Sequence, residues 1–132
     1  MAKSIRDARE LAMKILFQMD ANKNFDYELF VANDITGDFK DSPRVMDILE
    51  NMKLHITDID NTIEENSKNR KVQRIPKADL AIIRVAVCEI LYLDDVPEAV
   101  SINEAVELAK AYGTDKAPGF INALLGQTVR SR

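Results

Sequence analysis

The sequence predicts an all-α protein of about six or seven helices, folded as one compact domain over residues 1–132. Only four glycines and four prolines occur in the 132 residues, and these are few turn-forming residues for the many turns of a sheet. Apolar residues instead recur at steps of three and four along several segments, the spacing of an amphipathic helix. A chain of this length can bury one substantial core, so we expect a single domain.

The first expected helix covers residues 5–19 and has one apolar face. Its apolar positions are Ile5, Ala8, Leu11, Ala12, Ile15, Leu16 and Met19. With 3.6 residues per turn, the opposite flank carries Lys3, Arg6, Glu10, Met13, Lys14 and Phe17, with Arg9 at its edge. Two interpretations of Phe17 remain open. It packs under a neighbouring helix, which composition favours, or it stacks a nucleic-acid base beside phosphate-binding side chains.

Residues 27–37 are expected to form a short second helix, and residues 43–65 a long one. Ser42 is a suitable N-cap for the long helix, and Pro43 fits its first turn. The apolar residues of the long helix form a narrow seam, typical of lengthwise packing: Val45, Leu49, Met52, Ile56, Ile59 and Ile63. His55 is the one histidine in the sequence, which argues against a metal site.

The connection 66–74 is basic, and two interpretations of it are equally open: a solubilising loop or a polyanion-binding segment. Residues 68–84 carry six basic side chains against one acidic, whereas residues 26–65 carry eleven acidic against three basic. The net charge of −4 therefore hides basic patches and does not exclude nucleic acid as a partner.

A central helix is expected over residues 75–92. Residues 80–93 are apolar on almost every side, interrupted only by Arg84 and Glu89, and such a helix lies at the centre of a fold. Pro76 suits its first turn, and Asp79 lies where the helix dipole favours a carboxylate. Because an unpaired buried charge is costly, we expect Arg84 and Glu89 each to pair with a residue of another helix.

Two further helices are expected towards the C-terminus. Ser101 and Glu104 have the spacing of a capping box, which predicts a helix start at residue 101. The apolar stripe of that helix is expected to consist of Ile102, Ala105, Val106, Ala109 and Tyr112. Gly113 is expected to end it. Residues 114–115 are expected to cap the last helix, whose apolar face begins with Phe120, and a packed role for Phe120 is the ordinary interpretation.

The residue sets of an enzyme are missing from the sequence. The one histidine and one cysteine form no nucleophile and base pair, and the four glycines are too scattered for a phosphate-binding loop. Cys88 lies inside the apolar central helix, which favours a buried structural thiol and a reducing compartment. The first residues contain no apolar signal segment, and no segment is long and apolar enough to cross a membrane. We therefore expect a cytoplasmic protein that is not an enzyme and has no metal or cofactor.

Several motifs, taken in order, resemble the NusB family of transcription antitermination factors. They are RDARELAMKILFQ at residues 6–18, AIIRVAVCEILY at 81–92, DVP at 95–97, SINEAVELAK at 101–110, YG at 112–113 and GFINALLG at 119–126. The resemblance reaches both ends of the chain and weakens only between residues 24 and 70. It implies an all-helical fold of two small helical bundles packed across each other.

The resemblance implies binding rather than catalysis. Members of this family bind the boxA element of ribosomal RNA leader transcripts as single-stranded RNA, together with a small-subunit ribosomal protein, NusE. They join the RNA polymerase elongation complex with other Nus factors. By position, RNA contacts are implied for Lys3, Arg6, Arg9, Lys14, Phe17, Lys116, Phe120 and Asn122. Contacts with the ribosomal protein are implied for Arg74, Lys77 and Asp79.

One alternative from another class remains: a helical protein-interaction or homodimerising module without specific RNA binding. The two differ in salt dependence. Affinity for RNA falls steeply with ionic strength because counterions are released from the phosphates, whereas an apolar protein interface is much less sensitive.

Overall fold

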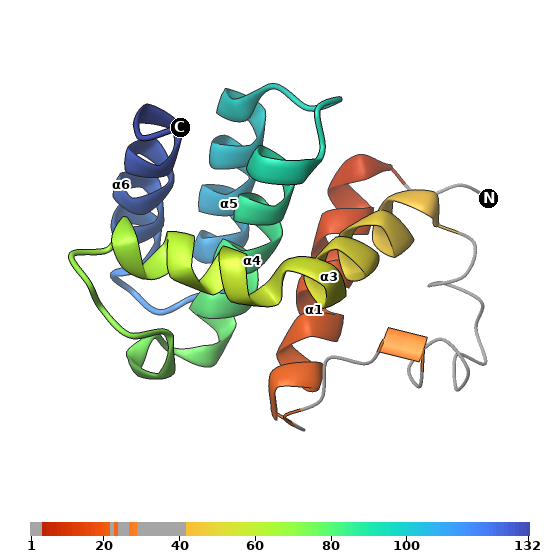
Figure 1. The fold of residues 1–132 in the computed structure, drawn as a ribbon, viewed down its shortest axis with the longest axis horizontal. Coiled ribbons are helices and arrows are strands. Elements are labelled where there is room, and N and C mark those ends of the chain that lie inside the picture. The colour runs from red at the N-terminus through yellow and green to blue at the C-terminus, as the bar shows by residue number, and fades with distance from the viewer. Residues whose placement is uncertain (1–3, 22, 24–26, 29–41) are drawn as a thin grey trace.

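The computed structural model describes residues 4–21, 23, 27–28 and 42–132, and within these ranges every regular element is a helix (Figure 1). The elements are α1 (Ile5–Ala21), α3 (Pro43–Glu65), the 3₁₀ helix η1 (Val72–Arg74), α4 (Lys77–Tyr92), α5 (Glu98–Tyr112) and α6 (Ala117–Arg130). The all-α prediction is confirmed, but these ranges hold five α-helices rather than six or seven. The short helix expected at 27–37 lies outside the described residues, except that Tyr27 and Glu28 are helical.

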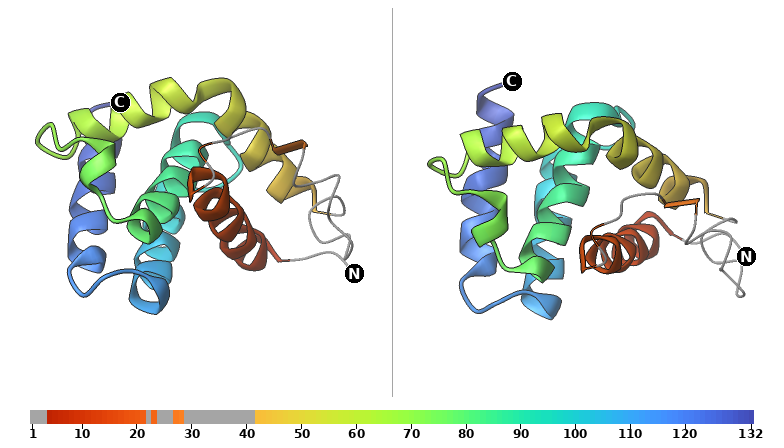
Figure 2. Two further views of the ribbon diagram at one scale, coloured as in Figure 1. Left: turned by 90° about the horizontal axis from the view of Figure 1, so that it is seen from below. Right: turned by 60° about the horizontal axis from the view of Figure 1, so that its bottom comes forward.

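The helix α4 lies at the centre of the fold. All of its residues 79–90 are buried, as the apolar run in the sequence predicts. It packs against α1, α3, α5 and α6. In the views of Figures 1 and 2, α1 and α6 lie on opposite sides of α4. Two groups of helices, one with α1 and α3 and the other with α5 and α6, therefore share α4, which confirms the expected pair of bundles.

The long helix α3 runs along both groups and bends between them (Figure 1). It begins as predicted: Ser42 is the N-cap, its Oγ accepts a hydrogen bond from the Val45 amide at 3.3 Å, and Pro43 follows in the first turn. The helical geometry is interrupted at His55, where φ is −125° and ψ is 18°. The His55 ring stacks on Tyr92 at the end of α4, with ring centroids 4.0 Å apart. This bend lets one apolar seam contact α1 and, further along, α6.

The charges buried with α4 are paired, as expected. Arg84 donates hydrogen bonds to both carboxylate oxygens of Asp60 in α3, at 3.0 and 2.9 Å, and lies 3.6 Å from Asp20 in α1. Cys88 is buried, and burial raises the pKa of its thiol to about 12, consistent with a structural role. None of the helices in the described ranges is long and apolar enough to cross a membrane, and those ranges hold no group of three acidic, histidine or cysteine side chains placed for a metal.

The start of α5 differs from the prediction. The helix begins at Glu98, because the carbonyl of Pro97 already accepts hydrogen bonds from the amides of Val100 and Ser101, at 2.9 and 3.2 Å. Ser101 therefore lies inside the first turn instead of capping it. Its hydroxyl is buried and has no hydrogen-bond partner in the described part of the chain. Glu104, the other half of the expected capping box, points to α1 instead.

Candidate nucleic-acid interface

Arg9 is an interior residue rather than a surface cation. It is 4% exposed, and its Nε lies 2.7 and 2.9 Å from the two carboxylate oxygens of Glu89 in α4. Its NH1 also lies 3.6 Å from Glu104 in α5. The side chain of Arg9, for which the resemblance implies a contact with RNA phosphates, is thus buried and paired within the chain, where its guanidinium neutralises the fully buried carboxylate of Glu89.

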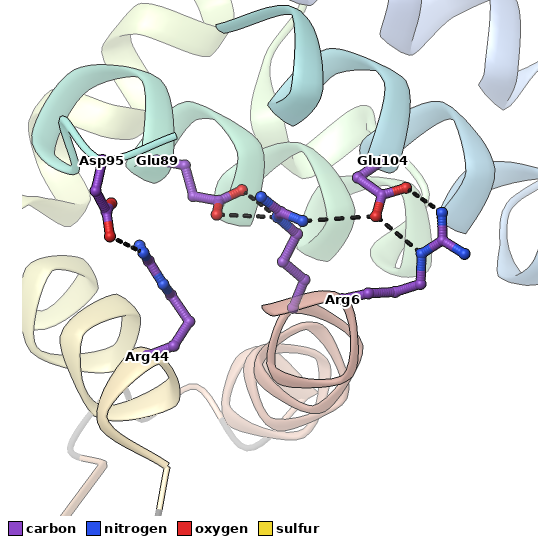
Figure 3. A network of polar contacts seen from close by, with 6 residues as sticks. Arg6, Arg44, Glu89, Asp95 and Glu104 are labelled. Carbon is purple, nitrogen blue, oxygen red and sulfur yellow. Dashed lines mark hydrogen bonds and ion pairs between the residues drawn. The ribbon is translucent and has the colours of Figure 1, made fainter. Parts of the chain in front are cut away.

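Arg6, one turn earlier on α1, stays at the surface. Its side chain is 72% exposed and donates two hydrogen bonds of 2.9 Å to the oxygens of Glu104. These hydrogen bonds raise the pKa of Arg6 and lower the pKa of the Glu104 carboxyl. Glu104 thus joins the exposed Arg6 to the buried Arg9, and Figure 3 shows it between α1 and α5. Because a phosphate has the same bidentate geometry as a carboxylate, it can take the place of Glu104 on Arg6.

Phe17 lies at the surface beside a second exposed aromatic residue. It is 41% exposed, and Tyr112 at the end of α5 is 42% exposed. Both line a shallow hollow with Met13, Lys14, Gln18 and Ala78. Lys14 lies 5.2 Å from the centre of the Tyr112 ring and 3.1 Å from the Glu10 carboxylate. The Tyr112 hydroxyl donates a hydrogen bond to Glu10, which is the main reason why the pKa of Glu10 is lowered.

The turn between α5 and α6 is fastened to the start of α4 by Asp79. The carboxylate of Asp79 is 2% exposed and accepts hydrogen bonds from the amide and the hydroxyl of Thr114, at 3.1 and 2.9 Å. Thr114 therefore does not cap α6, which begins at Ala117 after Lys116 without a side-chain cap. Asp79, for which the resemblance implies a contact with the ribosomal protein, is thus buried and bound within the chain.

Gly113 is required at this turn for space and not for its backbone freedom. Its φ of −87° and ψ of 178° are open to any residue. A Cβ at this position would lie 2.9 Å from the Ala109 carbonyl oxygen, the Ala117 Cβ and the Asp79 Oδ1. Glycine thus allows α5, α6 and the start of α4 to meet closely.

Phe120 is a half-buried ring that lines two hollows. The first hollow, of about 400 Å³, is lined by Arg70, Pro76, Asp79, Thr114, Asp115, Lys116, Ala117 and Phe120. The second hollow, of about 620 Å³, is lined by Glu65, Asn66, Ser67, Lys68, Phe120, Ala123, Leu124, Gln127 and Arg130. The Arg70 guanidinium lies 5.1 Å from the centre of the Phe120 ring, a cation–π contact. The Phe120 ring is therefore neither fully packed nor fully exposed.

Three hollows together make up what we call the aromatic surface. It starts at a hollow lined by Arg6, Glu104 and Tyr112, and Tyr112 is shared with the hollow beside Phe17. Ala78 of that hollow is the chain neighbour of Asp79, which lines the first hollow at Phe120. Residues from α1, the end of α5, the start of α4 and the start of α6 therefore contribute to the aromatic surface.

The remaining predicted residues divide into exposed and paired ones. Lys116 and Asn122 are exposed near the first turn of α6, and Arg74 is exposed at the end of η1. Lys77 is exposed too but lies 3.0 Å from Asp20. Lys3 lies outside the described residues.

Arg70 and Tyr112 line the same hollows, although the sequence analysis did not name them as candidate RNA contacts. Arg70 belongs to a basic connection for which the sequence left two interpretations open. Tyr112 was expected in the apolar stripe of its helix, and only its place at the last residue of that helix signalled exposure.

A helical scaffold that presents exposed rings among basic side chains belongs to the class of proteins suited to single-stranded nucleic acid. Comparison with known proteins makes this assignment more specific. A model of the NusB family matches residues 6–130. The chain belongs to the NusB family.

Individual relatives agree with the family assignment over nearly the whole chain. The transcription antitermination protein NusB of Alkaliphilus oremlandii is 43% identical over 124 residues, covering 92% of this chain and 90% of the relative. That of Finegoldia magna is 41% identical over 138 residues, covering 98% and 96%. Among solved structures, NusB of T. maritima has a TM-score of 0.89 at 28% identity, covering 100% of this chain and 94% of the other.

Proposed function

We propose that this protein is a transcription antitermination factor that binds single-stranded boxA-type RNA together with the ribosomal protein NusE and joins the RNA polymerase elongation complex in the cytoplasm. Residues 1–132 act as one RNA-binding domain, without a catalytic step. The observation that carries the proposal is the aromatic surface, where Phe17, Tyr112 and Phe120 lie beside exposed cations. The names of the relatives support the same conclusion.

On this surface, different residues stack on the bases and contact the phosphates. Phe17 and Phe120 provide rings on which bases stack, and every base has a face that can do so. Arg6, Lys14 and Lys116 contact phosphates, as does Lys3 at the start of the chain. Asn122 offers an amide to the edge of a base. Arg9 takes no direct part but holds Glu104 beside Arg6.

The protein partner binds near the start of α4. Arg74 and Lys77 are exposed cations three residues apart, at the end of η1 and the start of α4. Asp79 acts as a positioning residue, since it holds Thr114 and with it the turn that carries Lys116. Binding of NusE at this end of the aromatic surface would enlarge the surface available to the RNA.

The test is binding of the purified protein to a short boxA-type RNA and to a scrambled RNA, with and without NusE, at two salt concentrations. We expect selective binding that NusE strengthens and that falls with salt, with a log–log slope of about −0.7 for each phosphate neutralised. Arg74→Glu and Lys77→Glu should weaken binding of NusE measured without RNA.

Failure to prefer the boxA-type RNA, even with NusE, would overturn this function. Salt-insensitive association of the chain with itself or with NusE alone would then favour the alternative, a helical interaction module. Arg132→Gln is a suitable control variant, because Arg132 pairs with Glu98 and lines none of the hollows described above.

A further inference from the structure

The Phe120 ring has a neighbour on one side and open space on another. The Arg70 guanidinium lies 5.1 Å from the ring centre and lines the first hollow. Arg70 is not among the residues that line the second hollow, which Phe120 also lines. The part of the ring that borders the second hollow is therefore left uncovered by Arg70 and open to a flat ligand.

The lining of the second hollow has the chemistry of a nucleotide site. Ala123 and Leu124 give it apolar walls next to the ring. Asn66 and Gln127 bring side-chain amides. The Asn66 amide already donates to the Thr62 carbonyl and accepts from the Ser131 hydroxyl, and Gln127 Oε1 accepts from Arg130. Each amide has a second N–H and a second lone pair for the edge of a base. Lys68 and Arg130 bring two cations against one carboxylate, that of Glu65. Stacking, hydrogen bonding to base edges and phosphate pairing are the three contacts by which proteins hold single-stranded RNA.

Arg130 is held in place by its own helix. Its NH2 donates a hydrogen bond to Gln127 Oε1 at 3.0 Å. A Cβ at Gly126 would lie 3.3 Å from Arg130 NH1, so glycine at this position leaves room for the guanidinium to fold back along α6. The cation is thus positioned before any ligand arrives.

Lys68 is held by the connection after α3. It has a left-handed φ of 57°, as does Asn69 at 62°, which makes the chain reverse sharply at this point. The Asn69 amide donates a hydrogen bond to the carbonyl of Glu64 at 2.9 Å, and the Val72 amide donates to the Glu64 carboxylate at 3.0 Å. Lys68 therefore sits at the tip of an ordered turn on the rim of the second hollow.

We propose that the second hollow is a nucleotide subsite. One RNA base stacks on the part of the Phe120 ring that Arg70 leaves open, and its phosphate pairs with Lys68 and Arg130. The inference rests on the proposed function, since it states where the bound RNA continues beyond the turn between α5 and α6. The Phe120 ring then makes two contacts, one with the Arg70 guanidinium in the first hollow and one with the base in the second.

The test uses boxA-type RNA that carries the fluorescent base 2-aminopurine at one position at a time. In the wild-type protein, stacking on Phe120 should quench one of these positions, and Phe120→Ala should remove the quenching. Ala123→Ile narrows the second hollow only. We expect it to remove quenching at the same position and to weaken binding about tenfold, within the range of one stacked base.

Lys68→Gln tests the phosphate contact without adding bulk. It should weaken binding and reduce the slope of log affinity against log salt by about 0.7. Lys110→Gln is the matched control, because Lys110 is an exposed lysine of α5, paired with Glu107 at 3.4 Å and lining neither hollow. Thermal melting establishes that each variant is folded. If Ala123→Ile does not fold, Lys68→Gln alone tests whether the second hollow is a nucleotide subsite.

Three results would overturn the subsite, and they differ in meaning. If Phe120→Ala weakens RNA binding but Ala123→Ile and Lys68→Gln behave like Lys110→Gln, the base enters through the first hollow and the proposed function stands. If the second-hollow variants lose NusE and keep the RNA, the hollow is a protein site. If the wild-type protein shows no selective RNA binding at all, the proposed function itself fails.

Discussion

Asp79 in the first turn of α4 accepts two hydrogen bonds from Thr114, which lies 35 positions later in the turn between α5 and α6. The contact ties the start of α4 to the turn between α5 and α6, where Lys116 and Phe120 follow. Among the hydrogen bonds of the described residues, only these two join that turn to α4.

Thr114→Val should destabilise the fold and loosen this part of the aromatic surface. The substitution keeps the shape but removes the hydroxyl donor from a buried carboxylate, a loss of about 1.5–3 kcal/mol in the free energy of unfolding. Urea denaturation measures it. Thr62→Val is the matched control, since its hydroxyl donates to a main-chain carbonyl on the exposed side of α3. Equal effects of the two substitutions would contradict the special role of Thr114.

Gly113→Ala and Gly119→Ala should change stability in opposite directions. A methyl group at residue 113 meets three atoms at 2.9 Å, whereas one at residue 119 meets nothing within 4 Å. We expect Gly113→Ala to destabilise the protein by about 1–3 kcal/mol through overcrowding. Gly119→Ala should stabilise it by up to about 1 kcal/mol, because alanine restricts the unfolded chain and favours the helix. Thermal and urea unfolding of both variants provides the comparison.

The pair of Arg9 and Glu89 should behave as a unit. Arg9→Met leaves a buried carboxylate without its partner, and we expect a loss of about 3–5 kcal/mol in the free energy of unfolding. The double variant Arg9→Met/Glu89→Leu should recover most of that loss, because no unpaired charge remains. Arg6→Met serves as the exposed control and should change stability by less than about 1 kcal/mol. A double variant as unstable as Arg9→Met would show that packing, and not charge, dominates at this position.

Phe17→Ala should separate binding from folding. The ring is 41% exposed, so its removal should change stability little, while loss of one stacked base weakens RNA binding by about 1–3 kcal/mol. Ile15→Ala, two residues earlier but buried, should show the reverse pattern: a large loss of stability and, in the folded fraction, unchanged affinity. Retained RNA affinity in folded Phe17→Ala protein would remove this residue from the binding site.

Stability should decrease in acid in part through Glu104. Hydrogen bonding to Arg6 lowers the pKa of Glu104 in the folded protein below its ordinary value of 4.5. Between these two pKa values the unfolded state binds more protons than the folded state, so the stabilisation is complete above pH 4.5 and is lost as the pH falls through the folded pKa. Urea unfolding at a series of pH values should show a smaller slope in this window for Glu104→Gln and for Arg6→Gln. Slopes equal to that of the wild-type protein would exclude the contribution.

The sequence is a good guide to features that depend on neighbours along the chain. The central position of α4 follows from its unbroken apolar run, and the start of α3 follows from Ser42 and Pro43. Local signals fail where two of them compete. Pro97 and Ser101 can each begin a helix, and the earlier one does so.

Contacts between distant residues could not be predicted from the sequence. Arg6 and Arg9 are one turn apart on α1, and which of them is buried depends on where α4 and α5 cross that helix. The hold of Asp79 on Thr114 has no local signature, and neither has the contact of Arg70 with Phe120. The aromatic surface is assembled from four helices and one connection, so the sequence indicated members of it without their arrangement.

Three of the cations on or beside the aromatic surface already have a carboxylate at hand: Arg6 has Glu104, Lys14 has Glu10 and Lys77 has Asp20. In a cell crowded with DNA and structured RNA, a surface neutralised in this way exerts little attraction on polyanions at large. Under the proposed function, an RNA strand contacts those cations when its phosphates replace the resident carboxylates while its bases stack on the rings. Under the proposed function, these carboxylates therefore disfavour nucleic acid that offers phosphates without unstacked bases.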